Sequence, residues 1–567
     1  MKRRTILATP LLAALAVTGL SACGSDSAGT GSATGSSTTL PKSSMNPVDR
    51  DKISDGGNFT YPISSFAETW NSMDAAGNEV DYTTVRGTMS ARFINTNESG
   101  EYEIDKNWCD DITGEEKDGK TVVTIKMNPK AKWNDGAAFT LADWTNTVKA
   151  GANADKKFNV ASTEGYDQIE KVEQGGDANT FVITFKSTYS QWRGLVAGGP
   201  ARAESVKDAD TFNKGWADLK KASDAGWFSG PFIVDKIDKG KSVIVKRNPN
   251  WWGETPKLET VTFIVQDPTS NAAAFLNGQV DAFDIGVNAD NYAKAQSYTE
   301  GEIRRSNSLM WRHFTFNTKA ASLQDKAVRR AIVQYLDRAQ IAKSDMAGMG
   351  LPEVTPLNNH SFMQDQAPYK DMAEETGLKF DQAAAEKTMT DAGYAKDSSG
   401  IWAKDGKQVA IKFTTLTGVK VSENEGKQFQ DQMAKFGIKV TMAPVPSDQM
   451  TPTLDKRAFE VIAFTWAGTP YPYGAINQFF NPSSSSNYSG MDNAEVVKLI
   501  NIISTEMDDD KRNQAVTDAE KIVWEDPQIL PLYQRPQQYG VKKGLANFGA
   551  YGLITPWSIW ENVGWVK

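Results

Sequence analysis

The chain has 567 residues, too many for a single hydrophobic core, so its length predicts about two to four domains. Its composition, 40% hydrophobic and 23% charged, is that of an ordinary globular protein. The formal net charge is −8, and no cluster of lysine or arginine offsets it, which argues against binding to a nucleic-acid phosphate backbone.

The first 22 residues are predicted to be a signal peptide. "MKRR" is basic, and the apolar "TILATPLLAALAVTGL" after it is too short and wrongly flanked for a stable membrane span. Leu20–Cys23, "LSAC", followed by Gly24, resembles the cleavage box of bacterial lipoproteins. That resemblance implies cleavage before Cys23 and acylation of its sulfur, and more than one acyl chain makes anchoring stable. A plain secretory signal with an incidental cysteine is the alternative, and the Sec or twin-arginine export route stays open.

Residues 23–49 are rich in Gly, Ser and Thr and are predicted to be a flexible tether. Removal of residues 1–22 deletes three basic residues and no acid, so the mature net charge is −8 − 3 = −11. We expect a soluble body held through Cys23 on the outer face of the cytoplasmic membrane, on the extracellular or periplasmic side. Cys109 would then stand alone, which excludes an intrachain disulfide.

Alternating apolar residues predict strands at several places along the chain. These are Thr121–Met127, Thr180–Lys186, Ser242–Asn248 and Thr260–Gln266. Apolar residues at helical spacing predict helices in the second half, the first of them after the candidate caps Ser322 and Asp325. The three apolar faces are Val328, Ala331, Ile332, Tyr335 and Leu336; Val496, Leu499, Ile500 and Ile503; and Val516, Ala519 and Val523.

A β-α-β unit is predicted within this half. The strands are Val409–Leu416 and Ile438–Val445; the helix between them would begin at a capping box of Ser422 and Glu425 and end at Gly437. Such a crossover favours a parallel strand pair in a sheet covered by helices. The chain is therefore predicted to be mixed α/β with at least two lobes.

The stretch "FTWAGTPYPYG", Phe464–Gly474, begins where the strand-like "FEVIAF" ends and combines Trp466, Tyr471 and Tyr473 with two prolines and two glycines. Proline fixes φ and glycine permits tight backbone, so a rigid aromatic loop at a strand end is expected. The loop is either a well-packed corner or the wall of a binding site.

Motifs of catalysis are absent from the sequence. It has two histidines, His313 and His360, far apart, and it contains no H-E-x-x-H, C-x-x-C or G-x-S-x-G motif. "GKS" at Gly240–Ser242 imitates the end of a phosphate loop, but Asp235 stands where the first glycine belongs, so a hairpin turn is predicted. No metal site and no cofactor are expected. A secreted hydrolase with a carboxylate pair stays an alternative.

Several stretches together resemble the large extracellular solute-binding proteins of ABC importers, the dipeptide- and oligopeptide-binding family. Each is weak alone, but they follow one another in the family's order: "AKWNDGAAFTLADW" (131–144), "SGPFIVDKIDKGKSVIVKRNPNWWG" (229–253), "AAFLNGQVDAFDIG" (273–286), "FTFNTKAASLQDKAVRRAIVQYLDRAQI" (314–341) and "TMTDAGYAKDSSGIWAKDGK" (388–407). The resemblance implies an α/β fold, two-lobed and periplasmic-binding-protein-like, of type II and the large peptide-binding class, with an extra inserted domain.

The resemblance also implies a division of the chain into domains. Lobe I would be discontinuous and consist of residues 50–85, 220–305 and 526–567, because the family's C-terminus returns to the first lobe. Residues 86–219 would form a subdomain inserted into that lobe, and residues 306–525 would form lobe II.

In peptide-binding relatives a loop like Phe464–Gly474 carries an aspartate for the free amino terminus of the peptide. The matching place here is about Thr469, and the loop contains no acid, so plain peptide specificity is in doubt. Two other aromatic stretches, "ETWNSMD" and "SLMWRHFTFN", are expected to face the same cleft. The candidate ligand-binding residues are Trp70, Asn71, Trp311, Arg312, Trp466, Gly468, Thr469, Tyr471 and Tyr473, with Trp466 as a stacking platform.

The function implied is capture of a peptide, or a peptide-like or other small solute, in the interlobe cleft and its delivery to an ABC permease in the membrane. The protein would be a monomer, not an enzyme, and would bind no nucleic acid. A regulatory or glycolipid-handling lipoprotein of the same fold is the alternative that involves no import.

Overall fold

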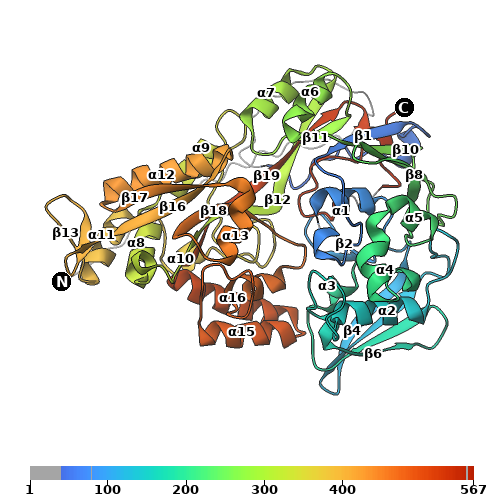
Figure 1. Ribbon diagram of the computed structural model, residues 1–567, viewed down its shortest axis with the longest axis horizontal. Helices are drawn as coiled ribbons and strands as arrows, with labels where there is room; N and C mark the ends of the chain where they lie inside the picture. The colour runs from blue at the N-terminus through green and yellow to red at the C-terminus, as the bar shows by residue number, and fades with distance from the viewer. Residues whose placement is uncertain (1–39, 78, 557–559) are drawn as a thin grey trace, which may run out of the picture. The chain divides into compact units, whose positions relative to one another are not determined.

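The computed structural model describes residues 40–77, 79–556 and 560–567 (Figure 1). The predicted signal peptide, Cys23 and the first part of the tether lie outside the described residues. Residues 39–567 form one compact unit. Among the described helices, none combines the length and the apolar character that a membrane span requires.

The largest sheet has six strands in the order β11-β19-β12-β18-β16-β17. Their bounds are Ala282–Asp284 (β11), Ile529–Lys542 (β19), Gly301–Phe316 (β12), Val461–Ala467 (β18), Ala410–Thr417 (β16) and Lys439–Pro446 (β17). Strand β16 is parallel to both β17 and β18, and the other pairs are antiparallel. The largest apolar core of the described residues lies against this sheet.

The predicted β-α-β unit is confirmed: α12 (Lys420–Phe436) links the parallel strands β16 and β17 and packs on both. The helix ends at Gly437, whose φ of +97° favours glycine. The predicted capping box is wrong, because the helix begins before Ser422. The Ser422 hydroxyl instead accepts the backbone N–H of Leu416 (3.0 Å), and Glu425 pairs with Arg312.

A four-stranded sheet in the order β1-β10-β9-β8 has its own core. The strands are Asn58–Ile63 (β1), Thr260–Val265 (β10), Ser242–Arg247 (β9) and Phe232–Asp238 (β8). Gly240, at φ +75°, lies between the antiparallel β8 and β9, so the hairpin turn predicted at "GKS" is confirmed. C-terminal residues join this core: the Phe548 ring lies 4.8 Å from that of Phe59, and β20 (Leu545–Ala546) pairs with β21 (Gly564–Trp565).

A second four-stranded sheet, antiparallel throughout, has the order β4-β5-β7-β6 and a third core. Its strands are Cys109–Lys117 (β4), Lys120–Met127 (β5), Thr180–Phe185 (β7) and Ile169–Gln174 (β6). Cys109 is a buried free thiol. The short strands are β2 (Ile94–Thr96) with β3 (Tyr102–Ile104), and β13 (Ala395–Lys396), β14 (Trp402–Lys404) and β15 (Lys407–Gln408).

The described helices that precede β12 have at most 12 residues each. They are α1 (Val80–Gly87), α2 (Leu141–Ala152), α3 (Trp192–Val196), α4 (Ala209–Lys214), α5 (Leu219–Asp224), α6 (Asn271–Leu276) and α7 (Ala289–Ser297). The other helices are α8 (Lys326–Tyr335), α9 (Arg338–Asp345), α10 (Met372–Glu375), α11 (Gln382–Asp391), α13 (Met450–Asp455), α14 (Ala475–Phe480), α15 (Ala494–Thr505) and α16 (Asp509–Glu525). The predicted helices at α8, α15 and α16 are confirmed; Asp325 caps α8 by accepting from the Ala327 N–H.

The predicted domain boundaries stay a prediction. The cores show that the C-terminal segment is shared: Ile529–Tyr533 belongs to the core of the six-stranded sheet, whereas Tyr539–Val563 contributes to the core beside β1.

Candidate binding site

A cavity of about 610 Å³ lies where helices and loops of residues 70–229 meet the loop after β18 and residues 555–556. That volume is in the range of small-molecule binding sites. Seven of the described lining residues are aromatic: Trp70, Trp133, Tyr166, Trp216, Trp227, Phe228 and Tyr471. Among the described lining residues, Arg86 and Arg92 alone carry a charge, and none is an acid.

The loop that carries Trp70 and Asn71 is held rigidly by hydrogen bonds. The backbone N–H of Trp70 donates to the carbonyl of Trp216 (2.9 Å), and the Asn71 side chain donates to the carbonyl of Phe212 (3.1 Å) while accepting from the N–H of Met73 (3.0 Å). The Trp70 indole is fully buried against the rings of Phe66 and Tyr82. Its Nε1 group finds no acceptor in the described part of the chain.

The two arginines come from α1 and the segment that follows it. Arg86, in the last turn of α1, donates to the carbonyl of Gly77 (2.7 Å) and to the Thr83 hydroxyl (3.2 Å). The Nε group of Arg92 is buried and has no acceptor among the described residues. Burial lowers the pKa of each guanidinium to about 10, so both are cations at neutral pH.

The loop after β18 closes on the cavity through its tip. At its base the N–H of Gly468 donates to the carbonyl of Leu309 (2.9 Å), and a Cβ at that glycine would lie 2.4 Å from the same oxygen. The exposed Thr469 hydroxyl accepts from the Tyr471 N–H (3.2 Å) and donates to the Tyr471 carbonyl (3.1 Å). This turn places Pro470 and Tyr471 on the cavity wall.

Tyr471 also contacts a distant part of the chain. Its ring stacks on that of Tyr102 in β3, with ring centres 5.2 Å apart and planes at 11°, and the Tyr102 hydroxyl donates to the carbonyl of Pro470 (3.2 Å). The Arg193 guanidinium lies 5.7 Å from the centre of the Tyr102 ring. These contacts, called the Tyr102–Tyr471 clasp below, join residues 86–219 to residues 306–525.

The structure brings only part of the predicted site together. Trp70, Asn71 and Tyr471 line the cavity. Gly468 and Thr469 shape the loop without lining the cavity. Trp466 and Tyr473 pack behind the loop: the Trp466 ring stacks on that of Tyr488 (5.9 Å, 5°), and the Tyr473 ring lies under the Arg512 guanidinium (4.1 Å).

Two predicted site residues, Trp311 and Arg312, need correction, because they are buried in the core of the six-stranded sheet. Strand β12 lies inside the sheet, between β18 and β19. Trp311 and Arg312 point to opposite faces and are only 1% and 6% exposed, so both faces of the sheet are covered at this position. The Arg312 Nε group donates to Glu425 (2.9 Å) in a buried ion pair, and Nη1 donates to the Thr465 hydroxyl (3.1 Å). A cation already paired in this way is not available to a ligand in the cavity.

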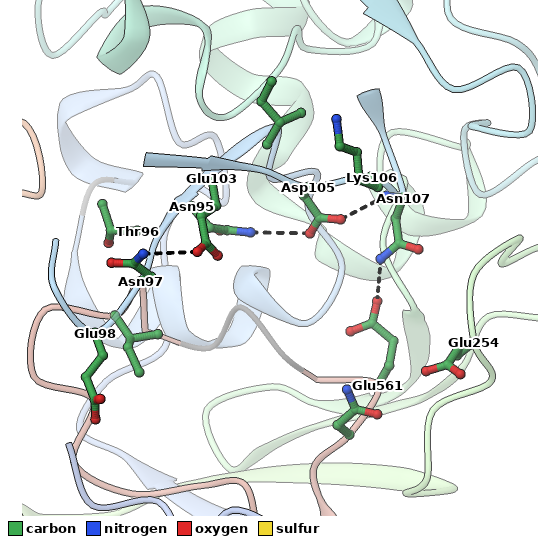
Figure 2. Close-up of a pocket in the computed structure, with 13 residues that line it drawn as sticks. Asn95, Thr96, Asn97, Glu98, Glu103, Asp105, Lys106, Asn107, Glu254 and Glu561 are labelled. Atoms are coloured by element: carbon green, nitrogen blue, oxygen red, sulfur yellow. Dashed lines mark hydrogen bonds between the residues drawn. The ribbon is translucent and has the colours of Figure 1, made fainter. Parts of the chain in front are cut away.

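A second cavity, of about 480 Å³, is rich in carboxylates (Figure 2). Its acids are Glu98, Glu103, Asp105, Glu254 and Glu561. Figure 2 shows the Asn95 amide directed at Asp105 (3.3 Å) and the Asn107 amide at Glu561 (3.4 Å). Burial is the main reason that the pKa of Glu561 rises to about 7. No group of three or more acidic, histidine or cysteine side chains in the described chain has the geometry to hold a metal ion.

Two comparisons of the sequence with known proteins, one with family models and one with individual proteins, agree with each other. The model of a family described as bacterial extracellular solute-binding proteins, family 5 Middle, matches residues 100–487. The oligopeptide-binding protein OppA of Mycobacterium tuberculosis is 30% identical over 555 residues, which cover 96% of this chain and 91% of that protein.

Solved structures are similar in fold. The periplasmic EDTA-binding protein EppA matches with a TM-score of 0.81 at 20% identity, covering 93% of this chain and 98% of that chain. The oligopeptide-binding protein AppA from Bacillus subtilis, in complex with a nonapeptide, matches with a TM-score of 0.71 at 19% identity, covering 91% of this chain and 100% of that chain.

Proposed function

The chain belongs to family 5 of the bacterial extracellular solute-binding proteins, and we propose that it captures a peptide-like or other small solute and delivers it to an ABC permease. The observation that carries the proposal is the aromatic cavity, whose wall combines side chains of residues 70–229 with Pro470 and Tyr471 from the loop after β18 and with Thr555 and Pro556. A site built from separate parts of the chain can respond to ligand by closing.

The Tyr102–Tyr471 clasp supports this closing mechanism. It adds a stacked ring pair and a hydrogen bond beside the cavity, and both would be lost if the two segments moved apart. Ligand shifts such an equilibrium only through its differential affinity for the closed state, and about 5.5 kcal/mol moves closure from 1% to 99%. The permease would recognise the closed form.

The location proposed is the outer face of the cytoplasmic membrane, with acyl chains on Cys23 and the part of the predicted tether before Ser44 as a spacer. The prediction that the tether extends to residue 49 needs correction, because Ser44 exchanges two backbone hydrogen bonds with Ala550 (2.7 and 2.9 Å) and Met45 packs against the core beside β1. The support is the lipobox-like Leu20–Cys23 and the Gly/Ser/Thr composition after it. We propose that the protein acts as a monomer, because a single chain supplies both walls of the cavity.

The proposed solute need not be an ordinary peptide. The described cavity lining contains no carboxylate to pair with a peptide ammonium group, and Thr469 lies on the exposed side of the loop. The solutes of the related solved structures differ: one is of an EDTA-binding protein, and another is of an oligopeptide-binding protein in complex with a nonapeptide. Composition of the cavity is therefore a better guide to the solute than family membership.

The direct test is native mass spectrometry of the protein as purified, followed by identification of any small molecule that it carries. We expect one solute per chain, and raised melting temperature when that solute is added back. A protein that carries no solute and is not stabilised by any member of a broad pool of peptides and small organic acids would contradict the proposal.

A further inference from the structure

Ser190, just before α3, joins two distant parts of the chain. Its backbone N–H donates to the carbonyl of Ser504 (2.9 Å), and its hydroxyl donates to the carbonyl of Ile503 (2.7 Å), which is 313 residues away in sequence. Both carbonyls belong to the last turn of α15, where a helix has no partners of its own for such groups. Ser190 is 4% exposed, so it satisfies these two acceptors in a buried contact.

The turn between α15 and α16 adds an apolar side chain to this contact. Met507 packs against the core of the second four-stranded sheet, and the hydroxyl of Thr121 in β5 donates to its sulfur (3.7 Å). A thioether side chain is flexible and polarisable, which suits a contact that forms and separates. The contacts of Ser190 with the end of α15, together with those of Met507, are called the α15 latch below.

The α15 latch is next to the wall of the aromatic cavity. Gly194 and Leu195 of α3, the helix that follows Ser190, line the cavity. Tyr471 reaches the same helix from the loop after β18, because a Cβ at Gly194 would lie 3.2 Å from its ring. Figure 1 shows α15 and α16 beside α3, as the hydrogen bonds of Ser190 require. Separation of the latch would therefore move α3 away from Tyr471 and open the cavity.

We propose that the α15 latch holds residues 86–219 against residues 306–525 when no solute is bound, so that Ser190 and Met507 set how much of the free protein is closed. This inference rests on the closing mechanism of the proposed function and names residues that regulate it. The latch joins protein groups to one another, and its residues are not among the described lining of the cavity. Because the apparent affinity for a solute scales with the closed fraction, the latch raises it by the same factor for every solute.

Hydrogen–deuterium exchange of the purified full-length protein, dialysed to remove solute, tests the latch directly. In the closed form the Ser504 carbonyl protects the backbone amide at position 190, and in the open form that amide is exposed to water. Met507→Ala removes most of the apolar contact and should speed exchange of this amide about 5- to 10-fold. Ser190→Ala loses the hydroxyl hydrogen bond and should speed it about 2- to 10-fold. Small-angle X-ray scattering should give both variants a larger radius of gyration than the wild type.

Ile502→Ala is the matched control for these variants. Ile502 belongs to the same helix but is 46% exposed, so its truncation should change neither the exchange at position 190 nor the radius of gyration. The amides of β5 and β7 report on the folding of the sheet itself. They should keep their exchange rates in all three variants, because an open latch leaves the sheet intact.

Three results would overturn the latch. The first is exchange at position 190 in the wild type at the rate of an unprotected amide, and the second is unchanged exchange and radius in both Met507→Ala and Ser190→Ala. The third is an equal acceleration of the β5 and β7 amides, which would make the contact part of the stability of the sheet. No solute is needed for these measurements, so the latch can fail while solute binding stands. Absence of any bound solute would refute the proposed function without changing the exchange result.

Discussion

At the scale of single residues, two of the aromatic side chains in the loop Phe464–Gly474, those of Tyr471 and Trp466, have different surroundings. Tyr471 lines the cavity and stacks on Tyr102, whereas Trp466 is half-buried behind the loop, where its ring lies 4.8 Å from that of Phe479. The sequence left two alternatives for this loop, the wall of a binding site and a well-packed corner. The first describes Tyr471 and the second describes Trp466.

This difference predicts opposite phenotypes. Tyr471→Ala should reduce solute affinity about 2- to 10-fold, because a stacked aromatic pair contributes about 0.5–1.5 kcal/mol to the closed form, and should leave the melting temperature nearly unchanged. Trp466→Ala should lower the free energy of unfolding by about 3 kcal/mol with little effect on affinity. Calorimetric titration beside thermal melts measures both, with Tyr471→Phe as the control that keeps the ring. The reverse pattern would show that Trp466, and not Tyr471, contacts the solute.

Glu561 gives a prediction about pH. Its pKa is raised to about 7 by burial, so between about pH 4.5 and 7 the folded protein binds a proton that the unfolded chain has released. Stability from this group is therefore highest at low pH and falls as pH rises through 7, by about 3 kcal/mol in total. Glu561→Gln should remove that part of the decline. Denaturant unfolding at pH 5 and pH 8 checks it, and an equal decline in both proteins would contradict the assignment.

At the scale of elements, the spacing of apolar residues and the position of glycine predicted those features that depend on residues close together in the sequence. The β16-α12-β17 unit follows from apolar spacing and from Gly437, and the structure contains it. The capping box failed because Ser422 and Glu425 have the right spacing but tertiary partners, and Arg312 lies 113 residues from Glu425 in sequence. Arg86 and Arg92 could not be singled out from the sequence, where they are two of 62 basic residues. Only the structure shows that both line the cavity.

The Arg312–Glu425 pair makes a prediction for the packing of α12 on the sheet. Glu425→Gln would leave a buried guanidinium without its counter-charge, and breaking such a pair costs about 3–5 kcal/mol. Asp431→Asn changes the same charge on the exposed side of the same helix and should have little effect. Urea unfolding of the two variants compares them directly. Equal stability of both would mean that the pair contributes nothing net.

At the scale of the whole molecule, the predicted family and its mixed α/β two-lobed fold are confirmed by the family match and by the solved relatives. The ordered series of weak motifs carried that prediction, because the motifs are spread over most of the chain. The solute was not predictable in this way, since it depends on which side chains meet inside the cavity. Membership of the family also agrees with a transport function rather than catalysis.

Anchoring is the last property of the whole molecule that can be tested, and the chain's two cysteines provide a matched pair. Cys23 is the predicted site of acylation, and Cys109 is buried in β4. Each buried CH₂ of an acyl chain contributes about 0.8 kcal/mol to membrane binding, so two or more chains hold a protein stably and none leaves it free. Cys23→Ala should therefore move the protein into the medium or periplasmic fraction without acyl groups, while Cys109→Ala should stay with the membrane. Fractionation with mass spectrometry of the N-terminal peptide measures this. A Cys23→Ala protein that still sediments with membranes would show that something other than lipid holds it there.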